Sequence, residues 1–412
     1  MANRLSKNSR LLSHAKNVVR FYTVLIFLLA VLFFTNDFGF VEVQKTAIVT
    51  AVGIDREDDT YIVTSQIALP QSSNGNTPNN TATTSSVQLT SRGKTVADAF
   101  DQINAKTGWY PKLVFCNLIV LGEKTLERNV FDVLDFFLRN EYALDGALVC
   151  TCFGAAKTLL DTPTSTDQSS GLAIEKVLSQ HAEQVGTALP NTLREIANDH
   201  YLDASCSFLP IVNARKQQEQ VGENPSSREQ SSQTSEGGGQ QSKDKQSMVF
   251  NGSKTALLKQ GVKVGEFNEN ETFVFGLVKN KLRLASFTVD GDESFTLDIK
   301  NNKPSVKFSA KPQPKLDVSI VVRTGVSDFS YSQGRQFVQD AGALTQEHLQ
   351  KAEEKTTQLI TQIFEKCRLL NCDLFELVSS LKKYEPDRFD ELKDRVLQDT
   401  SLTVQVEFKN IR

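Results

Sequence analysis

The feature that most constrains this chain is an apolar run near its N-terminus, FYTVLIFLLAVLFF at residues 21–34. A spanning helix needs about 20 apolar residues. Counting from Val18, with Arg20 snorkelling, to about Phe40 reaches that length. The residues before the run include five cations and no acid, namely Arg4, Lys7, Arg10, Lys16 and Arg20. The sequence therefore predicts a membrane segment with a positive flank.

Four interpretations of this run compete. A cleaved signal peptide needs a small-x-small site after the run, and none follows. A lipoprotein needs a cysteine at the end of the run, whereas the first cysteine is Cys116. A buried core helix does not account for the cations. We therefore predict an uncleaved signal anchor at 21–40, with residues 1–20 cytoplasmic and residues 41–412 outside the membrane.

Charge and composition narrow the class of protein. The net charge is −3, and the first 20 residues contribute +5, so the remainder carries −8. A nucleic-acid binder would show a basic face, so that class is disfavoured. With 39% apolar residues over 412 positions, the chain is long enough for two to three domains with real cores.

Residues 41–165 are predicted to form a mixed α/β domain. Two β-rich runs, 42–52 and 61–69, flank the charged turn GIDREDDT and favour a hairpin. A polar loop at 71–86 has almost nothing to bury. The later predicted elements are a strand at Val87 and Leu89, a helix over 95–103, a buried central strand over 113–122, an amphipathic helix over 126–140, a buried strand over 147–153 and a short helix over 155–160.

A Thr/Ser/Pro-rich stretch at 161–171 marks a predicted boundary. Residues 166–215 then form a middle helical region, in two helical pieces broken near Gly186 and Pro190. Residues 216–246 are a low-complexity segment that contains one aliphatic residue, Val221. Such a segment cannot offset its chain entropy by burial, so it is predicted to be a disordered linker.

Residues 247–412 are predicted to be an α+β domain of strands, then helices, then a closing strand. A long helix over 346–370 is followed by shorter helices over 373–383 and near 387–397. Antiparallel strands with one wet face are predicted where apolar and polar residues alternate. The apolar positions are Phe295, Leu297 and Ile299, then Val306, Phe308 and Ala310, then Leu316, Val318, Ile320 and Val322, and finally Leu402, Val404, Val406 and Phe408.

Motifs for catalysis or cofactor binding are not found in the sequence. The tripeptide Gly93-Lys94-Thr95 lacks the glycine five positions earlier that a phosphate loop needs, and a strand-to-helix turn explains it. A calcium site at Asp55, Glu57, Asp58 and Asp59 lacks the EF-hand spacing, so a solvated turn is favoured. The histidines are His14, His181, His200 and His348. With few histidines and no nucleophile motif, the sequence predicts no catalytic residue, no metal and no cofactor.

The six cysteines show neither a CxxC motif nor a zinc spacing. Cys150 and Cys152 would share one face of a strand. Burial as small hydrophobes is favoured. A disulfide outside the cell remains an alternative whose pairs the sequence does not assign. The other cysteines are Cys116, Cys206, Cys367 and Cys372.

Four stretches in order resemble the Ger(x)C family, the C subunits of GerA-type spore germinant receptors. They are VQKTAIVTAVGIDREDDTYIVTSQIALP (43–70) with its VGID turn, GKTVADAFDQI (93–103) leading to IVLGE (119–123), VFNGSKTALLKQGVKVGEFNENET (249–272), and the C-terminal end through Cys372-Asp373-Leu374-Phe375 and Pro386 to a closing strand. The resemblance covers about residues 42–412. Family members are typically lipoproteins, and this chain has the apolar run instead of a lipobox cysteine.

The resemblance implies an elongated protein of three mixed α/β domains on the outer face of the inner spore membrane. It implies A-type and polytopic B-type partner subunits in a germinant receptor, and no catalytic residues. The germinant, the interface residues and any contact with the germinant stay open. An alternative is a membrane-anchored binding or adhesion module with another envelope role.

Overall fold

A computed structural model describes residues 18–30, 46–68, 86–164, 167, 169–181, 188–216, 248–282, 284–289, 293–331 and 344–411. The chain separates into two compact units, Met1–Thr46 and Ala47–Arg412. In the first, residues 18–30 are helical and their large apolar side chains are exposed. No helix among the described residues is long and apolar enough to cross a membrane. The predicted anchor at 21–40 lies only partly within these residues.

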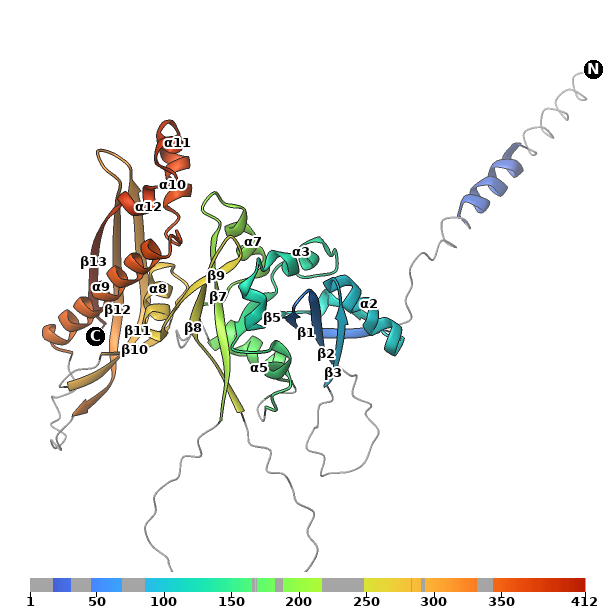
Figure 1. Ribbon diagram of the computed structural model, residues 1–412, viewed down its shortest axis with the longest axis horizontal. Coiled ribbons are helices and arrows are strands. Elements are labelled where there is room, and N and C mark those ends of the chain that lie inside the picture. The colour runs from blue at the N-terminus through green and yellow to red at the C-terminus, as the bar shows by residue number, and fades with distance from the viewer. Residues whose placement is uncertain are drawn as a thin grey trace, which may run out of the picture. The chain divides into compact units, whose positions relative to one another are not determined.

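The second unit contains a nine-stranded sheet whose strand order is β3-β2-β1-β5-β6-β7-β8-β9, with β4 paired to β1 (Figure 1). Pairing is parallel from β1 through β5 and β6 to β7, and antiparallel between the flanking strands. The strands are β1 (Thr46–Glu57), β2 (Thr60–Ala68), β3 (Ser86–Gly93), β4 (Tyr110–Lys112), β5 (Leu118–Leu121), β6 (Leu148–Cys152), β7 (Cys206–Lys216), β8 (Met248–Lys259) and β9 (Val262–Phe267).

Helices cover both faces of this sheet, which is why its central strands are apolar throughout. On β5, Leu118 and Val120 face one core and Ile119 and Leu121 face the other. One core is closed by α2 (Val96–Thr107), α3 (Phe131–Arg139) and α7 (Leu193–Tyr201), and the other by α4 (Ala156–Leu160) and α5 (Ser170–Lys176), which continues as a π-helical turn over Val177–His181.

The predicted hairpin is confirmed, since β1 and β2 pair antiparallel around Asp58 and Asp59. The predicted strand over 113–122 is shorter than expected. Its first residues form a 3-10 turn over Leu113–Phe115, and only Leu118–Leu121 extends into the sheet. A second 3-10 turn, Glu123–Glu127, replaces the start of the helix predicted over 126–140. The predicted polar loop at 71–86 lies outside the described residues except Ser86, which begins β3.

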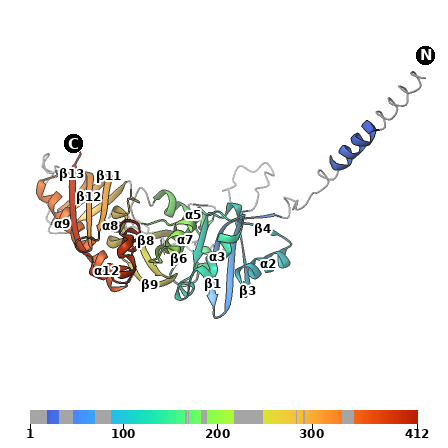
Figure 2. The ribbon, with the colours of Figure 1, turned by 90° about the horizontal axis from the view of Figure 1, so that it is seen from above.

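A second sheet has the order β10-β11-β12-β13, and α9 lies alongside its strands (Figure 2). Pairing is antiparallel within β10-β11-β12, and β13 joins β12 in parallel. Its elements and the C-terminal helices are β10 (Ala285–Val289), β11 (Glu293–Ser309), β12 (Lys315–Tyr331), α9 (Gln346–Leu369), α10 (Leu377–Tyr384), a 3-10 turn (Pro386–Arg388), α11 (Phe389–Leu392), α12 (Val396–Asp399) and β13 (Ser401–Asn410).

The two apolar sets predicted as separate strands, 295–299 and 306–310, fall on one strand, β11, except for Ala310, which follows the end of that strand. A bulge between Ile299 and Asn301 separates them. An extra residue shifts the side-chain alternation by one, so the inward positions change from odd to even numbers. Val306 faces the same side as its pairing partner Val318, yet it is 41% exposed, so its predicted burial is wrong.

The closing strand β13 is confirmed, with a correction to its burial. Only Phe408 is fully buried, whereas Leu402, Val404 and Val406 are half-buried against the core. The physical reason is position, because β12 is the only strand paired with β13 among the described residues. An edge strand covers one side of the core rather than its centre.

Helix α8 (Glu269–Val278) joins the two sheets. All its residues from Glu271 to Val278 are buried, and the stretch from Phe273 to Val278 carries no polar side chain. Phe275 on α8 packs edge-to-face against Phe208 of β7, with ring centroids 5.6 Å apart. On the other side, the Asn302 amide of β11 donates to the Leu277 carbonyl (2.7 Å). The core of the C-terminal part therefore includes residues of the nine-stranded sheet.

The predicted middle region and the predicted C-terminal domain both contribute strands to the nine-stranded sheet. Strand β7 comes from the predicted middle region (166–215), and β8 and β9 come from the predicted C-terminal domain (247–412). The predicted linker (216–246) lies outside the described residues apart from Lys216, and its flanking strands β7 and β8 pair along most of their lengths. The division into separately folding domains stays a prediction.

Candidate functional site

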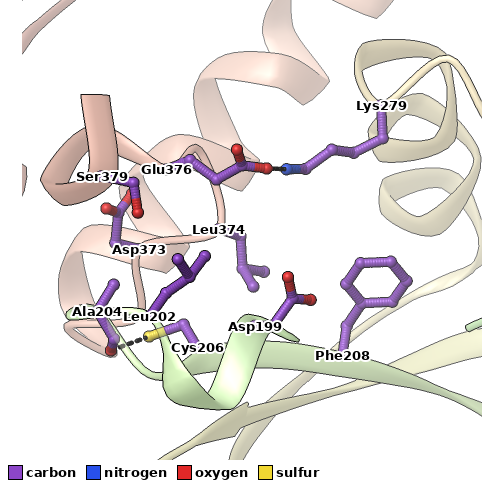
Figure 3. Close-up of a pocket in the computed structure, with 10 residues that line it drawn as sticks. All are labelled: Asp199, Leu202, Ala204, Cys206, Phe208, Lys279, Asp373, Leu374, Glu376 and Ser379. Atoms are coloured by element: carbon purple, nitrogen blue, oxygen red, sulfur yellow. Dashed lines mark hydrogen bonds and ion pairs between the residues drawn. The ribbon is translucent and has the colours of Figure 1, made fainter. Parts of the chain in front are cut away.

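A small cavity lies where α7, β7, the end of α8 and the start of α10 converge (Figure 3). Its volume is about 20 Å³, which is room for about one water molecule. Pockets that bind small molecules usually enclose ~300–1,000 Å³. The cavity is therefore a joint between structural elements rather than a pocket for a nutrient-sized ligand.

Ion pairs surround this joint and connect residues distant in sequence. Lys279, after α8, pairs with Glu376 at 2.6 Å (Figure 3). Lys382 on α10 pairs with Asp203 at 2.8 Å. These pairs are partly exposed, so each contributes at most ~1 kcal/mol. Their effect is chiefly to fix how the C-terminal helices sit against the end of α7.

A buried acid holds the start of α10. Asp373 is 5% exposed, and its Oδ2 accepts a hydrogen bond from the Val378 backbone N–H at 2.8 Å. Burial raises the pKa of Asp373, while hydrogen bonds from backbone N–H groups oppose that rise. The side chain therefore caps a helix.

A second acid at the joint, Asp199 on α7, is half-buried. Burial raises the pKa of Asp199 to about 6, and the nearby Lys279 opposes the rise. A carboxyl whose folded-state pKa lies above its unfolded value stabilises the fold most when it is protonated. That contribution is complete below pH ~4 and is lost as the pH rises through about 6.

We expect Asp199→Asn to raise the free energy of unfolding by about 1–2 kcal/mol at pH 7.5 and by much less at pH 3.5, below the unfolded pKa of 3.8, where the side chain is largely protonated in both the folded and the unfolded chain. Urea denaturation of both proteins at the two pH values checks this. The exposed Asp394 provides the control, since Asp394→Asn should change little at either pH. An equal gain at both pH values would contradict the assignment.

The structure also brings together three cysteines, Cys206, Cys367 and Cys372, beside this joint. All six cysteines are buried free thiols. Burial raises the pKa of Cys116, Cys152 and Cys367 to about 12. Cys150 and Cys152 face the same core from one face of β6, as predicted. The spacing of Cys206, Cys367 and Cys372 in the sequence does not predict that these three lie close together.

The tripeptide Gly93-Lys94-Thr95, considered as a phosphate loop, instead forms the N-terminal cap of α2. Thr95 Oγ1 accepts from the Asp98 N–H (3.1 Å), and the Lys94 N–H donates to Asp98 Oδ2 (2.9 Å). A Cβ on Gly93 would lie 2.4 Å from the Ala99 backbone nitrogen, so glycine is required for the close approach of strand and helix.

The four carboxylates considered for calcium have separate partners. Glu57 pairs with Arg92 (3.2 Å) and Asp59 with Arg128 (3.4 Å). Asp58 occupies the hairpin turn with φ 51°. Asp55 instead points inward, where Oδ1 accepts from Ala156 N–H (2.6 Å) and Oδ2 from Lys157 N–H (2.9 Å). Only Asp55 is buried, and it caps α4.

His200 and His348 make local contacts. His200 stacks on Phe131, with centroids 3.7 Å apart, and its Nδ1 lies 3.3 Å from Ser205 Oγ. Burial lowers the pKa of His200. The Thr345 N–H donates to Nδ1 of His348, at the start of α9 (3.3 Å). Neither histidine lies at the joint lined by Asp199 and Asp373.

Two family models match the chain in order. Residues 39–214 match the spore germination protein N-terminal domain, and residues 253–412 match the C-terminal domain described as spore germination B3/GerAC like. Together they cover most of the chain. The chain belongs to the Ger(x)C family.

Two similar proteins share low sequence identity with this chain. The putative spore germination protein YfkR of Bacillus subtilis (strain 168) is 22% identical over 307 residues, which is 73% of each chain. The crystal structure of the GerBC protein aligns over 88% of this chain and 97% of its own, with 17% identity and a TM-score of 0.46.

The VGID motif that carried the Ger(x)C resemblance lies within strand β1 rather than in a turn, and it has a structural role. Gly53 lies against α4, where a Cβ would come within 2.8 Å of Leu160 Cδ1 and 3.2 Å of Ala156 Cβ. Asp55 caps the same helix. The motif therefore fixes α4 against β1. Gly53 and Asp55 are needed for this packing whether or not they contact a ligand.

Proposed function

We propose that this chain is a non-enzymatic, membrane-anchored subunit of a spore germinant receptor. It acts with a polytopic B-type subunit and an A-type subunit in the response to nutrient germinants. The observation that carries the proposal is the pair of Ger(x)C domain matches, which occur in order and cover most of the chain. The role is structural, since the subunit holds membrane partners together or couples them.

The helix at 18–30 supports the anchor in this proposal. Its apolar side chains are largely exposed, including Phe27 at 70% and Val19 at 65%. Exposing this many apolar side chains to water is unfavourable. Burial in lipid would remove them from water, and cations next to the helix are typical of membrane segments. The anchor confines the remaining domains to a thin layer at the outer face of the spore inner membrane, which raises their effective concentration toward membrane partners.

The geometry of the joint supports a non-enzymatic role. Its acids cap a helix or face lysines, and its cavity admits about one water molecule. A groove of about 750 Å³ between α9 and the β12–β13 edge is larger, but it opens to solvent. Its lining mixes polar side chains such as Gln350 and Glu354 with apolar ones such as Ile320 and Val404.

The test compares spores that lack the gene with spores carrying either the full chain or a form whose residues 1–40 are replaced by a cleavable signal. We expect deletion to abolish the response to at least one nutrient, because the receptor loses a subunit. The full chain should restore it, and the untethered form should restore it only weakly.

The same strains also carry the measurement that separates the alternatives. The tagged full chain should co-purify in mild detergent with a polytopic membrane protein. If deletion spores respond normally to every nutrient tested, the receptor role is wrong. A membrane-anchored binding module with another envelope role would then take its place.

A further inference from the structure

The three buried cysteines beside the joint come from distant parts of the chain. Cys206 begins β7, Cys367 lies in the last turns of α9, and Cys372 follows that helix. The Cys372 N–H donates to the Cys367 carbonyl at 2.9 Å, which folds the chain back toward β7 and β8. We call these three residues the thiol cluster.

Within the thiol cluster, Cys206 and Cys372 are neighbours: Cys206 pairs with Lys259 of β8, and Cys372 Sγ reaches the carbonyl of the adjacent Leu258. Their other contacts hold both sulfurs at one end of the β7–β8 pair. Cys372 Sγ lies 3.5 Å from the carbonyl of Leu258, and Leu258 pairs with Ser207, the neighbour of Cys206. Cys206 Sγ lies 3.1 Å from the Ala204 carbonyl.

The two thiols differ in acidity in a way that favours reaction. The contact with Cys372 and a hydrogen bond from the Asp373 N–H lower the pKa of Cys206. The same contact and burial raise the pKa of Cys372. The thiolate is the attacking species in thiol–disulfide exchange. Cys206 is 8% exposed and Cys372 is fully buried, so Cys206 is the thiol that an oxidant reaches first and Cys372 is the second nucleophile.

We propose that Cys206 and Cys372 form a disulfide that ties β7 to the turn after α9. The oxidant is a disulfide of low molecular weight or of a thiol oxidoreductase. The Cys206 thiolate attacks one oxidant sulfur and releases the other as a thiolate, which leaves a mixed disulfide. Cys372, on losing its proton, attacks the Cys206 sulfur and releases the second thiolate. The two cysteines lose two electrons and two protons, and the oxidant becomes two thiols.

The bond would link the two family domains covalently. Cys206 lies within the N-terminal domain match (39–214), and Cys372 lies within the C-terminal one (253–412). A cross-link between residues this far apart in sequence closes a long loop, the case in which chain-entropy arguments expect the largest stabilisation. The pairing rests on the proximity of the two thiols, and it does not depend on the role in germination.

The experiment uses the full chain, purified under reductant in mild detergent. One sample is equilibrated with oxidised and reduced glutathione as folded protein, and a second is refolded from denaturant in the same buffer. Free thiols are then alkylated under denaturing conditions and counted by intact mass. We expect two of the six cysteines to be protected, and a non-reducing peptide map to show Cys206 joined to Cys372.

Variants identify the pair and its effect. Cys206→Ala and Cys372→Ala should each lose the protected pair, whereas Cys367→Ala and the distant Cys116→Ala should keep it. Reductant should lower the Tm of the oxidised wild type by roughly 5–15 °C, whereas the Tm of Cys206→Ala should not change. Six free thiols in both wild-type samples, or a map joining Cys367 to Cys372, would overturn the proposal. The wild-type map decides the question even if a variant fails to fold.

Discussion

Replacing Phe364 by alanine is expected to lower the free energy of unfolding by about 3–5 kcal/mol. Phe364 lies on α9 with none of its surface exposed. Its ring meets that of Phe375 edge-to-face, with centroids 5.4 Å apart. Phe375 in turn contacts Phe275 on α8, at 6.2 Å. Truncation removes buried apolar area and leaves a cavity where α9 meets α8, in a packed interior that closes only partly around the gap.

Urea denaturation followed by circular dichroism measures this effect. Leu369 provides a matched control, because it lies on the same helix and is 86% exposed. Leu369→Ala should change the free energy of unfolding by less than ~0.5 kcal/mol. Since domains typically have only ~5–15 kcal/mol of stability, Phe364→Ala should remove a large share of it. Equal effects of the two substitutions would show that α9 does not pack as described.

Replacing Asp55 by alanine is expected to cost about 2–3 kcal/mol, and Asp55→Asn less. The carboxylate accepts hydrogen bonds from two backbone N–H groups, those of Ala156 and Lys157. Alanine leaves both donors without that partner, and an unsatisfied buried donor costs ~1–3 kcal/mol. Asparagine keeps one acceptor oxygen. It also avoids burying a charge, the effect that raises the pKa of Asp55.

Thermal and urea unfolding of the Asp55 variants test this role beside a control from the same hairpin. Asp59 is exposed and meets Arg128 at 3.4 Å, so Asp59→Ala should cost less than ~0.5 kcal/mol. If Asp55→Ala were as mild as Asp59→Ala, the VGID motif of β1 would not hold α4, and a binding role for Asp55 would have to be considered again.

Local periodicity made several elements predictable. The helix predicted over 346–370 is α9, Gln346–Leu369, and the predicted hairpin is β1 and β2. The alternation at Phe295, Leu297 and Ile299 marks an inward face of β11. Each of these depends on residues near one another in sequence, whose spacing matches the helical or extended repeat.

The pairing of elements was outside the reach of such patterns. The alternation of apolar residues over 402–408 does not predict that β13 pairs with β12 in parallel at the edge of the sheet. This edge position is the reason that Val406 is only half-buried. The bulge after Ile299 is likewise decided by the register with β12. The candidate joint shares this property, because Asp199, Lys279 and Asp373 meet only after three helices have docked.

The amino-acid sequence by itself determined the apolar N-terminal run, the alternating strands, the long helix and the family, because each is written in neighbouring residues or in ordered motifs. The tertiary structure alone decided that α8 lies buried between two sheets, that Asp55 caps α4, and that Cys206 lies beside Cys372. These contacts join residues far apart in the chain. Their free energy depends on burial and on distances that exist only once the sheets and helices have packed together.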